Sequence, residues 1–573
     1  MRTQEAGFTA RRASKYRTRL TLFATAIFGL GFASMASGDD NLAGAAGRGC
    51  EWTQWGRSST HDSQSCAKGQ WAETILAEKV LDPFIQNDTP YGSLDHVQVP
   101  LSDGEGRTFI MGKTGIAGQP QTYVWSEKGY RWQHDQLVEQ WSYASDWKPA
   151  PLKTNGTSGL WQPALAKRFL YLPGAGGTLL KVDKQHGGLV QRINPFGGAI
   201  DPQRYVVGGV TADEDGNIVY NVLRLDASAP RTADVLEAWL VRVDKHGQIR
   251  KADYKQLIPD APAPNALCYL TYTQMQPVPP RPWPLPPQPD GSPTLPPQTA
   301  CLSQRPPLDA TPAIAADGTI YVVSRAHAAE HYGYLVALKP NLQLKWAASL
   351  RGHLNDGCGV LATVCRPGAT HGIDPSTNLP PAGVVNDSSS SSPVALPDGS
   401  VVFGAYTVYN GGRGHLMKFD RHGQYLANYD FGWDITPGVY RHGRSYSLVL
   451  KDQYYADDEY AITQLSPSLE EEWEYTNTNT QECERLPDGT IECEETGFHF
   501  EWCVATPGID RDGNVYAVSA DGNLYVIGQG GILQQRFFLE RTAYAAYTPT
   551  AIDHRGRIYP INNGKLFVVG RDR

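Results

Sequence analysis

The sequence predicts an all-β fold assembled from repeated four-stranded units. Its 573 residues include 58 Gly, 41 Pro and 29 Tyr, a composition typical of short strands joined by many turns. Hydrophobic residues make up 41% of the chain and charged residues 19%, which provides for a large buried core. A third observation, a motif that recurs along most of the chain, favours strands over helices.

The first 36 residues have the features of a secretory signal peptide. Five basic residues lie between positions 11 and 19, an apolar run covers 20–32, and small residues follow up to Ala36. We expect cleavage after Ala36, which leaves 37–51 as a leader and 52–573 as a single domain. Cleavage removes six basic residues and one acidic residue, so the net charge changes from -8 to -13.

A motif of Ser or Thr, Pro, a short apolar stretch and Asp-Gly recurs in one register. It occurs at Thr311-Pro312 to Asp317-Gly318, at Ser392-Pro393 to Asp398-Gly399 and at Thr506-Pro507 to Asp512-Gly513. Each Asp-Gly fits a tight hairpin, which needs the positive φ that Gly adopts readily. Each Pro marks the start of a strand, where it removes no important ladder hydrogen bond. A second strand pair follows, which gives four strands in each unit.

Eight such units can be counted, near 96–132, 161–193, 206–252, 310–349, 392–429, 435–475, 504–539 and 545–570. Four-stranded units that cannot bury both faces alone close into a ring as the blades of a β-propeller. The last unit lacks its outer strand, and we expect the segment 52–65 to supply it. The sequence therefore predicts an eight-bladed β-propeller, with seven blades as the alternative.

Three stretches carry a resemblance to a known family. They are residues 317–324 (Asp-Gly-Thr-Ile-Tyr-Val-Val-Ser), the paired turns at 512–513 and 521–522, and the opening segment 52–61. These stretches resemble the repeats of the pyrroloquinoline-quinone-like (quinoprotein alcohol dehydrogenase-like) β-propellers, over about residues 50–573. The family includes quinoprotein dehydrogenases and non-catalytic members such as the outer-membrane-protein assembly scaffold. The dehydrogenases carry two adjacent cysteines against the quinone, and no two cysteines are adjacent here, so the resemblance implies the fold rather than that activity.

Nine cysteines fall into local groups, which suits disulfides in an exported protein. We predict the pairs Cys50–Cys66, Cys268–Cys301, Cys358–Cys365 and Cys483–Cys493. In the last group Cys503 is a rival for either position. Zinc binding is the alternative role for these cysteines, but the sequence holds no Cys-x-x-Cys pair that would favour it.

The repeat also predicts where a functional site lies. The chain changes face at each strand end, so blade-to-blade connections share one face with the loops between second and third strands. The Asp-Gly turns lie on the other face. Three long insertions, near 253–309, 351–391 and 476–503, and the loops near 226–237, 325–333, 406–415 and 451–460 fall on the first face. We name it the loop-rich face and expect binding or catalysis there.

The loop-rich face holds the candidate site residues. The candidate catalytic residues are His327, His331, His353, His371 and His415, of which the first four are candidate ligands for copper, iron or zinc. Further candidate ligand-contacting residues are Glu330, Asp356, Tyr409, Arg413, Tyr454, Tyr455, Asp457, Asp458 and Trp502. Calcium or a sugar is a candidate ligand of the acidic loop at 454–459, which contains Asp457, Asp458 and Glu459. The alternative roles are solvated loop residues and, for Trp502, core packing. We expect the histidines at 327 and 353 to be exposed.

These observations favour an exported protein, periplasmic or secreted, that binds a protein or glycan partner through its loop-rich face without catalysis. The alternative is a periplasmic oxidoreductase that uses a quinone or a His-bound metal on that face. The acidic net charge argues against a nucleic-acid partner. No apolar stretch after the signal peptide approaches the ~20 residues of a membrane span. We expect the mature protein to be a monomer.

Overall fold

Residues 46–573 form one compact unit in the computed structural model. The structure describes residues 50–85, 95–152, 159–272, 283–355, 357–360, 365–407, 414–432, 434–455, 457–542 and 546–571. The expected signal peptide and nearly all of the expected leader lie outside these ranges. Strands dominate, and the helix α2 (Tyr254–Leu257) is a single turn. Within the described ranges, no helix is both long and apolar enough to cross a membrane.

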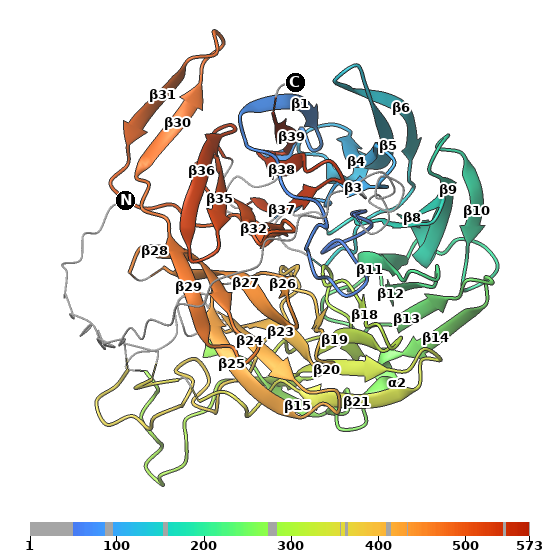
Figure 1. Cartoon of the computed structure of the whole chain (residues 1–573). Coiled ribbons are helices and arrows are strands. Elements are labelled where there is room, and N and C mark those ends of the chain that lie inside the picture. The colour runs from blue at the N-terminus through green and yellow to red at the C-terminus, as the bar shows by residue number, and fades with distance from the viewer. Residues whose placement is uncertain are drawn as a thin grey trace, which may run out of the picture. The chain divides into compact units, whose positions relative to one another are not determined.

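Eight antiparallel blades follow one another around a ring, which confirms the eight-bladed β-propeller (Figure 1). Blade 1 contains β3 (Leu101–Ser102), β4 (Arg107–Thr114), β5 (Val124–Gln133) and β6 (Gln136–Ala144), and blade 2 contains β7 (Ala164–Ala166), β8 (Phe169–Gly174), β9 (Thr178–Asp183) and β10 (Leu189–Ile193). Blade 3 contains β11 (Arg204–Ala212), β12 (Ile218–Arg224), β13 (Glu237–Val243) and β14 (Ile249–Asp253). Blade 4 contains β18 (Ala313–Ile314), β19 (Ile320–Ala326), β20 (Gly333–Leu338) and β21 (Leu344–Ser349). Blade 5 contains β22 (Val394–Ala395), β23 (Val401–Tyr406), β24 (Gly414–Phe419) and β25 (Tyr425–Phe431). Blade 6 contains β26 (Gly438–His442), β27 (Ser445–Tyr454), β28 (Glu459–Leu465) and β29 (Glu471–Thr476). Blade 7 contains β33 (Gly508–Ile509), β34 (Val515–Val518), β35 (Asn523–Gly528) and β36 (Ile532–Phe538).

The Asp-Gly turns explain why the blades repeat. In blade 7 the Oδ1 atom of Asp510 accepts hydrogen bonds from the backbone N–H groups of Asp512 and Asn514, at 2.9 Å each. Gly513 completes the turn at φ 85°, a conformation that disfavours other residues. The second and third strands of a blade are buried on both sides, as in β19 and β20, because neighbouring blades cover them. The core therefore lies between the blades.

The strand that closes the ring is not the one expected. Blade 8 contains β37 (Ala546–Ile552), β38 (Ile558–Asn562) and β39 (Lys565–Gly570), and its outer strand is β1 (Thr74–Val80). The strands β1 and β39 pair antiparallel from Thr74 opposite Gly570 to Val80 opposite Lys565. The assignment of this role to 52–65 was wrong, because those residues are used at the centre of the ring. Blade 1 also extends further than expected, to the end of β6.

Residues 50–66 form a covalent ring, closed by the disulfide Cys50–Cys66, which we name the N-terminal ring. In chain order, it hydrogen-bonds to the first strand of each of the first seven blades, at Ser102, Leu165, Ala212, Ile314, Ala395, Val439 and Ile509. Just beyond it, the N–H of Gln70 donates to Gly556 O of blade 8 at 2.7 Å. The contacted strands lead into the Asp-Gly turns. The N-terminal ring therefore fills the centre of the propeller on the face that carries those turns. We name this face the turn face.

Four disulfides join the predicted pairs, Cys50–Cys66, Cys268–Cys301, Cys358–Cys365 and Cys483–Cys493. Cys503, the rival in the last group, is the free and buried one. Three of the four disulfides lie within insertions of the loop-rich face. Each of these three insertions is therefore closed on itself.

Candidate functional site

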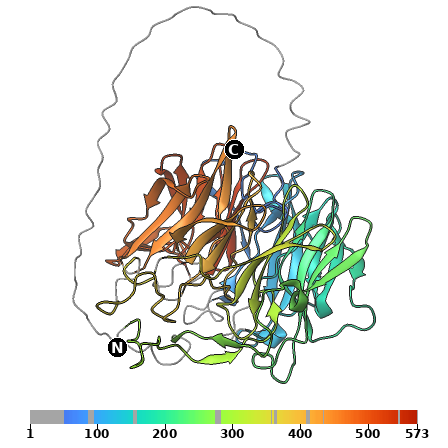
Figure 2. The same cartoon turned by 90° about the horizontal axis from the view of Figure 1, so that it is seen from below.

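The three insertions lie on one face because each returns along the second strand of the blade that follows it. Strand β17 (Gln304–Arg305) pairs with the end of β19, Val384 with the end of β23, and Trp502 with Ser519 just after β34. These positions are the strand ends opposite the Asp-Gly turns. In Figure 2 the green to yellow part of the chain, which holds the first two insertions, extends below the blades on one side of the ring.

A buried ion network joins two of the insertions to blade 4. We name it the insertion cluster: Arg305, Arg325, His327, Glu330 and Asp387. Arg305 donates to both carboxylate oxygens of Asp387, at 2.7 and 2.5 Å, and Arg325 reaches the same carboxylate at 3.2 Å. The side chain of Arg305 is 2% exposed and that of Asp387 is 20% exposed. Burial would raise the pKa of Asp387, but the charges of Arg305 and Arg325 outweigh it and hold the pKa well below its usual range.

His327 and His331 are buried rather than exposed, which corrects the expectation for His327. Burial and the charge of Arg305 lower the pKa of His327 to about 4, and burial and Arg351 lower that of His331 to about 3. The Nε of Arg305 donates to Nδ1 of His327 at 2.8 Å, so the Nδ1 lone pair is already engaged. Both imidazoles are therefore neutral at pH 7. The imidazole of His327 accepts one of the hydrogen bonds that hold the insertion cluster together.

The other three histidines lie in different surroundings. His353 stacks on Tyr425, with ring centroids 4.6 Å apart, and its Nε2 lies 3.0 Å from Ser349 O. His415 is fully buried on β24, whereas His371 is exposed. Within the described ranges, no three His, Cys, Asp or Glu side chains form a group that could hold a metal ion. The catalytic role of the five histidines stays a prediction.

The remaining candidates lie near blades 6 and 7 or outside the described ranges. Asp356, Tyr409 and Arg413 belong to the latter group. Asp458 accepts the backbone N–H of His499 at 2.9 Å, which ties the acidic loop to the third insertion. Trp502 is fully buried and packs edge-on against Tyr525 at 5.0 Å, so its indole has the core-packing position. Tyr455, Tyr454 and Asp457 lie at or just beyond the end of β27.

Sequence reasoning missed a buried titratable group between blades 6 and 7. Lys451 lies fully buried on β27, and burial lowers its pKa to about 8, an effect that the charges of Asp434 and Glu501 partly offset. Burial also raises the pKa of Glu501 and of the Cys503 thiol. The available signal was a lysine directly after the apolar run at 448–450. An amine with this pKa can exchange protons near neutral pH, but its burial keeps it away from a solute.

The chain matches no protein-family model and no curated protein. Among solved structures it is similar to a europium-containing methanol dehydrogenase, at 10% identity and a TM-score of 0.49, covering 91% of each chain. It is also similar to the quinohemoprotein alcohol dehydrogenase from Comamonas testosteroni, at 10% identity, a TM-score of 0.45 and coverage of 93% and 84%. BamB from Moraxella catarrhalis matches at 11% identity and a TM-score of 0.37, with coverage of 87% and 98%. The eight-bladed fold rests on the strand pairing of this chain itself.

Proposed function

We propose that this protein is a non-catalytic binding module that contacts a protein partner through its loop-rich face. The observation that carries the proposal is the hairpin of β30 (Gln481–Arg485) and β31 (Ile491–Glu495) in the third insertion. It extends outward beyond β36, as Figure 1 shows. Every residue of β31 is exposed, so this strand contributes little to the core of the propeller.

The hairpin is stabilised as an exposed ribbon. An isolated two-stranded hairpin is marginally stable in water, and the disulfide between the directly opposed Cys483 and Cys493 compensates for this. At its base, Arg541 donates to both carboxylate oxygens of Glu482, at 2.9 and 3.0 Å. Arg485 donates to Phe538 O at 3.2 Å. A ribbon held in this way loses little conformational entropy when it binds a partner.

The charge of the hairpin indicates a basic partner surface. Its acidic residues outnumber its one arginine, and they are Glu482, Glu484, Asp488, Glu492, Glu494 and Glu495. Ile491 and Phe498 beside them are 45% and 49% exposed, so apolar contact is available as well. Carboxylates next to exposed apolar side chains complement a protein surface with Lys or Arg. This combination favours a protein over a glycan.

We propose that the protein works in the periplasm or outside the cell, and its disulfides support this. Four disulfides, three of them in exposed insertions, persist in an oxidising compartment. We propose that the mature protein is a soluble monomer and that it meets its partner in the same compartment.

The alternative, an oxidoreductase with a quinone or a His-bound metal, has less support from the side chains. His327 and His331 are buried, and His353 is stacked on Tyr425. The five candidate histidines therefore do not present a shared set of accessible nitrogen atoms. For the quinone, the adjacent cysteine pair of the dehydrogenases has no counterpart in the sequence.

Site-specific photo-crosslinking tests the proposal. A photoreactive amino acid is placed at Glu492 on the hairpin and, as a matched control, at the exposed His246 on the turn face, in protein exported by its own cells. We expect a discrete adduct with one basic protein from position 492 and none from 246. In the purified pair, Glu484→Lys with Glu494→Lys should weaken binding about tenfold at low salt. Equal adducts from both positions, or no adduct from 492, would contradict the proposal.

A further inference from the structure

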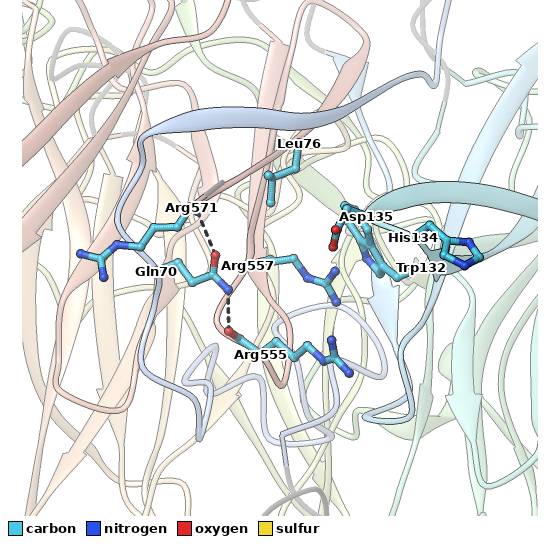
Figure 3. A pocket seen from close by; sticks show the side chains of 8 residues that line it. All are labelled: Gln70, Leu76, Trp132, His134, Asp135, Arg555, Arg557 and Arg571. Atoms are coloured by element: carbon cyan, nitrogen blue, oxygen red, sulfur yellow. Dashed lines mark hydrogen bonds between the residues drawn. The ribbon is translucent and has the colours of Figure 1, made fainter. Parts of the chain in front are cut away.

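A cavity of about 300 Å³ lies between blade 8 and blade 1 on the turn face, away from the loop-rich face. Its lining comes from the turn between β37 and β38, from β5 and its turn into β6, from β1 and the chain before it, and from the residue that follows β39. The lining residues are Gln70, Leu76, Trp132, His134, Asp135, Arg555, Arg557 and Arg571 (Figure 3).

Arg557 lines the cavity and has one side-chain nitrogen without a hydrogen-bond partner among the described residues. Its side chain is 8% exposed, its Nε donates to Asp553 Oδ2 at 2.9 Å, and its guanidinium lies 4.0 Å from the ring centroid of Trp132. The Nη2 atom is buried and has no hydrogen-bond partner within the described part of the chain. A buried N–H group without an acceptor destabilises the fold, and an arginine cannot lose its charge to relieve this.

The other blades show that the turn does not need an arginine here. Arg557 occupies the position four residues after the first Asp of the turn, and in blades 3 and 7 the same position is Asn217 and Asn514. Asn514 Nδ2 donates to Asp510 at 2.9 Å, and Asn217 makes the same bond to its turn Asp at 2.6 Å. A side chain that only closes the turn can therefore be an asparagine.

Blade 1 has an arginine at this position, and its surroundings differ. Arg107 donates to Asp103 at 3.0 Å and also to Glu105, so its guanidinium has a second carboxylate. Arg557 has no second carboxylate bond within the described ranges. Of these two arginines, Arg557 is the one that lines the cavity and has a buried nitrogen without an acceptor among the described residues.

The rest of the lining adds charge of both signs. Figure 3 shows the guanidinium groups of Arg555 and Arg557 on the same side, toward Trp132 and Asp135, whereas that of Arg571 points away. Arg571 pairs with Glu73 at 3.2 Å. The side-chain amide of Gln70 bonds to the backbone of both Arg555 and Arg571, at 3.0 Å each, and so fixes the two chain segments that carry the arginines.

We propose that this cavity binds a small oxyanion, either a carboxylate or a phosphate group, through Arg557 and Arg555. Nη2 of Arg557 donates from the buried base and the exposed guanidinium of Arg555 donates from the rim. Two guanidinium groups on one side of a cavity match the two or more oxygens of such a group by charge-assisted hydrogen bonds. Asp135 lies beside them and repels the anion, which limits its affinity. This site is separate from the proposed binding of a protein partner.

Calorimetric titration of the mature protein with inorganic phosphate and with succinate, at constant ionic strength, tests the proposal. We expect saturable binding of at least one probe, and the tighter probe identifies the group as phosphate or carboxylate. Arg557→Asn preserves the turn bond seen in blades 3 and 7 and should weaken binding at least about tenfold. Arg107→Asn is the matched control and should bind as the unmodified protein does. Equal affinities of the Arg557→Asn variant and the unmodified protein, or no binding of either probe, would overturn the proposal.

Two further variants make the result independent of the folding of Arg557→Asn. Arg555→Gln changes an exposed residue and should also weaken binding about tenfold. Asp135→Asn removes the repelling charge and should tighten binding several-fold. A loss of affinity in Asp135→Asn would contradict the proposal, because neither probe carries a cation that this carboxylate could hold and its removal can then only reduce repulsion.

Discussion

The two faces of the propeller are built by different means. On the turn face, the same local bonds recur from blade to blade, and the N-terminal ring contacts the first strand of seven blades in order. On the loop-rich face, every insertion differs from the others and is held by its own disulfide and by ion pairs between distant segments. The turn face is thus specified by short sequence motifs, and the loop-rich face by contacts that no repeat imposes. The loop-rich face can therefore vary without loss of the ring.

Disruption of the insertion cluster on the loop-rich face should cause the largest loss of stability. Asp387→Ala leaves two buried guanidinium groups, Arg305 and Arg325, without their shared carboxylate. We expect a loss of about 3–5 kcal/mol in the free energy of unfolding, measured by urea denaturation, because a broken buried pair leaves charge uncompensated.

Asp146→Ala is the matched control for this variant. Asp146 pairs with Arg192 at 2.8 Å, but the two side chains are 48% and 31% exposed. An exposed pair contributes about 0–1 kcal/mol, so this control should change stability by less than about 1 kcal/mol. Similar losses in both variants would show that burial does not distinguish the insertion cluster from an ordinary surface pair.

On the turn face, the disulfide of the N-terminal ring should have the next largest effect. Cys50→Ser with Cys66→Ser opens a loop that closes over a separation of 16 residues, and the loop-entropy estimate for this length is about 3 kcal/mol. The loss should appear in global unfolding, since the ring bonds to blades all round the axis. Calorimetric unfolding of the oxidised and double-serine proteins measures it. An unchanged midpoint would mean that the backbone bonds alone hold the ring in place.

The contrast between the faces also explains what the sequence could predict. The eight units, their turns and the disulfide-closed insertions follow from local signals such as Pro before a strand and Asp-Gly after it. The closing strand 74–80 carries no such signal, because it is a single strand separated by almost the whole chain from its partner β39. The segment 52–65 was misassigned because its bonds to seven blades involve residues as distant as Ile509.

The candidate site was harder to predict than the fold for the same reason. Loop membership suggested that His327 was exposed, but Arg305 and Asp387, from two different insertions, cover it. The pairing of Arg305 with residue 387 spans 82 positions and has no sequence motif. Likewise, the sequence does not show that Nη2 of Arg557 lacks an acceptor among the described residues. This follows from the structure, where the turn bonds of Asn217 and Asn514 can be compared with that of Arg557.

The buried histidines of the loop-rich face should make stability depend on pH. His331 has a folded-state pKa of about 3, below its ordinary value of 6.5, so protons bind the unfolded chain first as the pH falls. Its contribution is fully present above about pH 6.5 and is lost progressively as the pH falls toward 3. In His331→Gln, the slope of unfolding free energy against pH between 6 and 4 should fall by up to about 1.4 kcal/mol per pH unit. Urea denaturation at several pH values measures this, and an unchanged slope would contradict the burial of a neutral imidazole.

The hairpin disulfide should have the smallest effect on global stability. Cys483→Ser with Cys493→Ser removes a cross-strand bond from a ribbon whose strand β31 is entirely exposed, so unfolding of the ribbon exposes little of the propeller core. We expect the free energy of global unfolding to change by less than about 0.5 kcal/mol, while amide hydrogen exchange in 481–495 becomes much faster. Exchange measured by mass spectrometry separates the two effects. If this variant instead lost as much stability as the Cys50→Ser, Cys66→Ser protein, the hairpin would be part of the cooperative unit. Its rigidity would then serve the fold of blade 7 rather than the recognition of a partner.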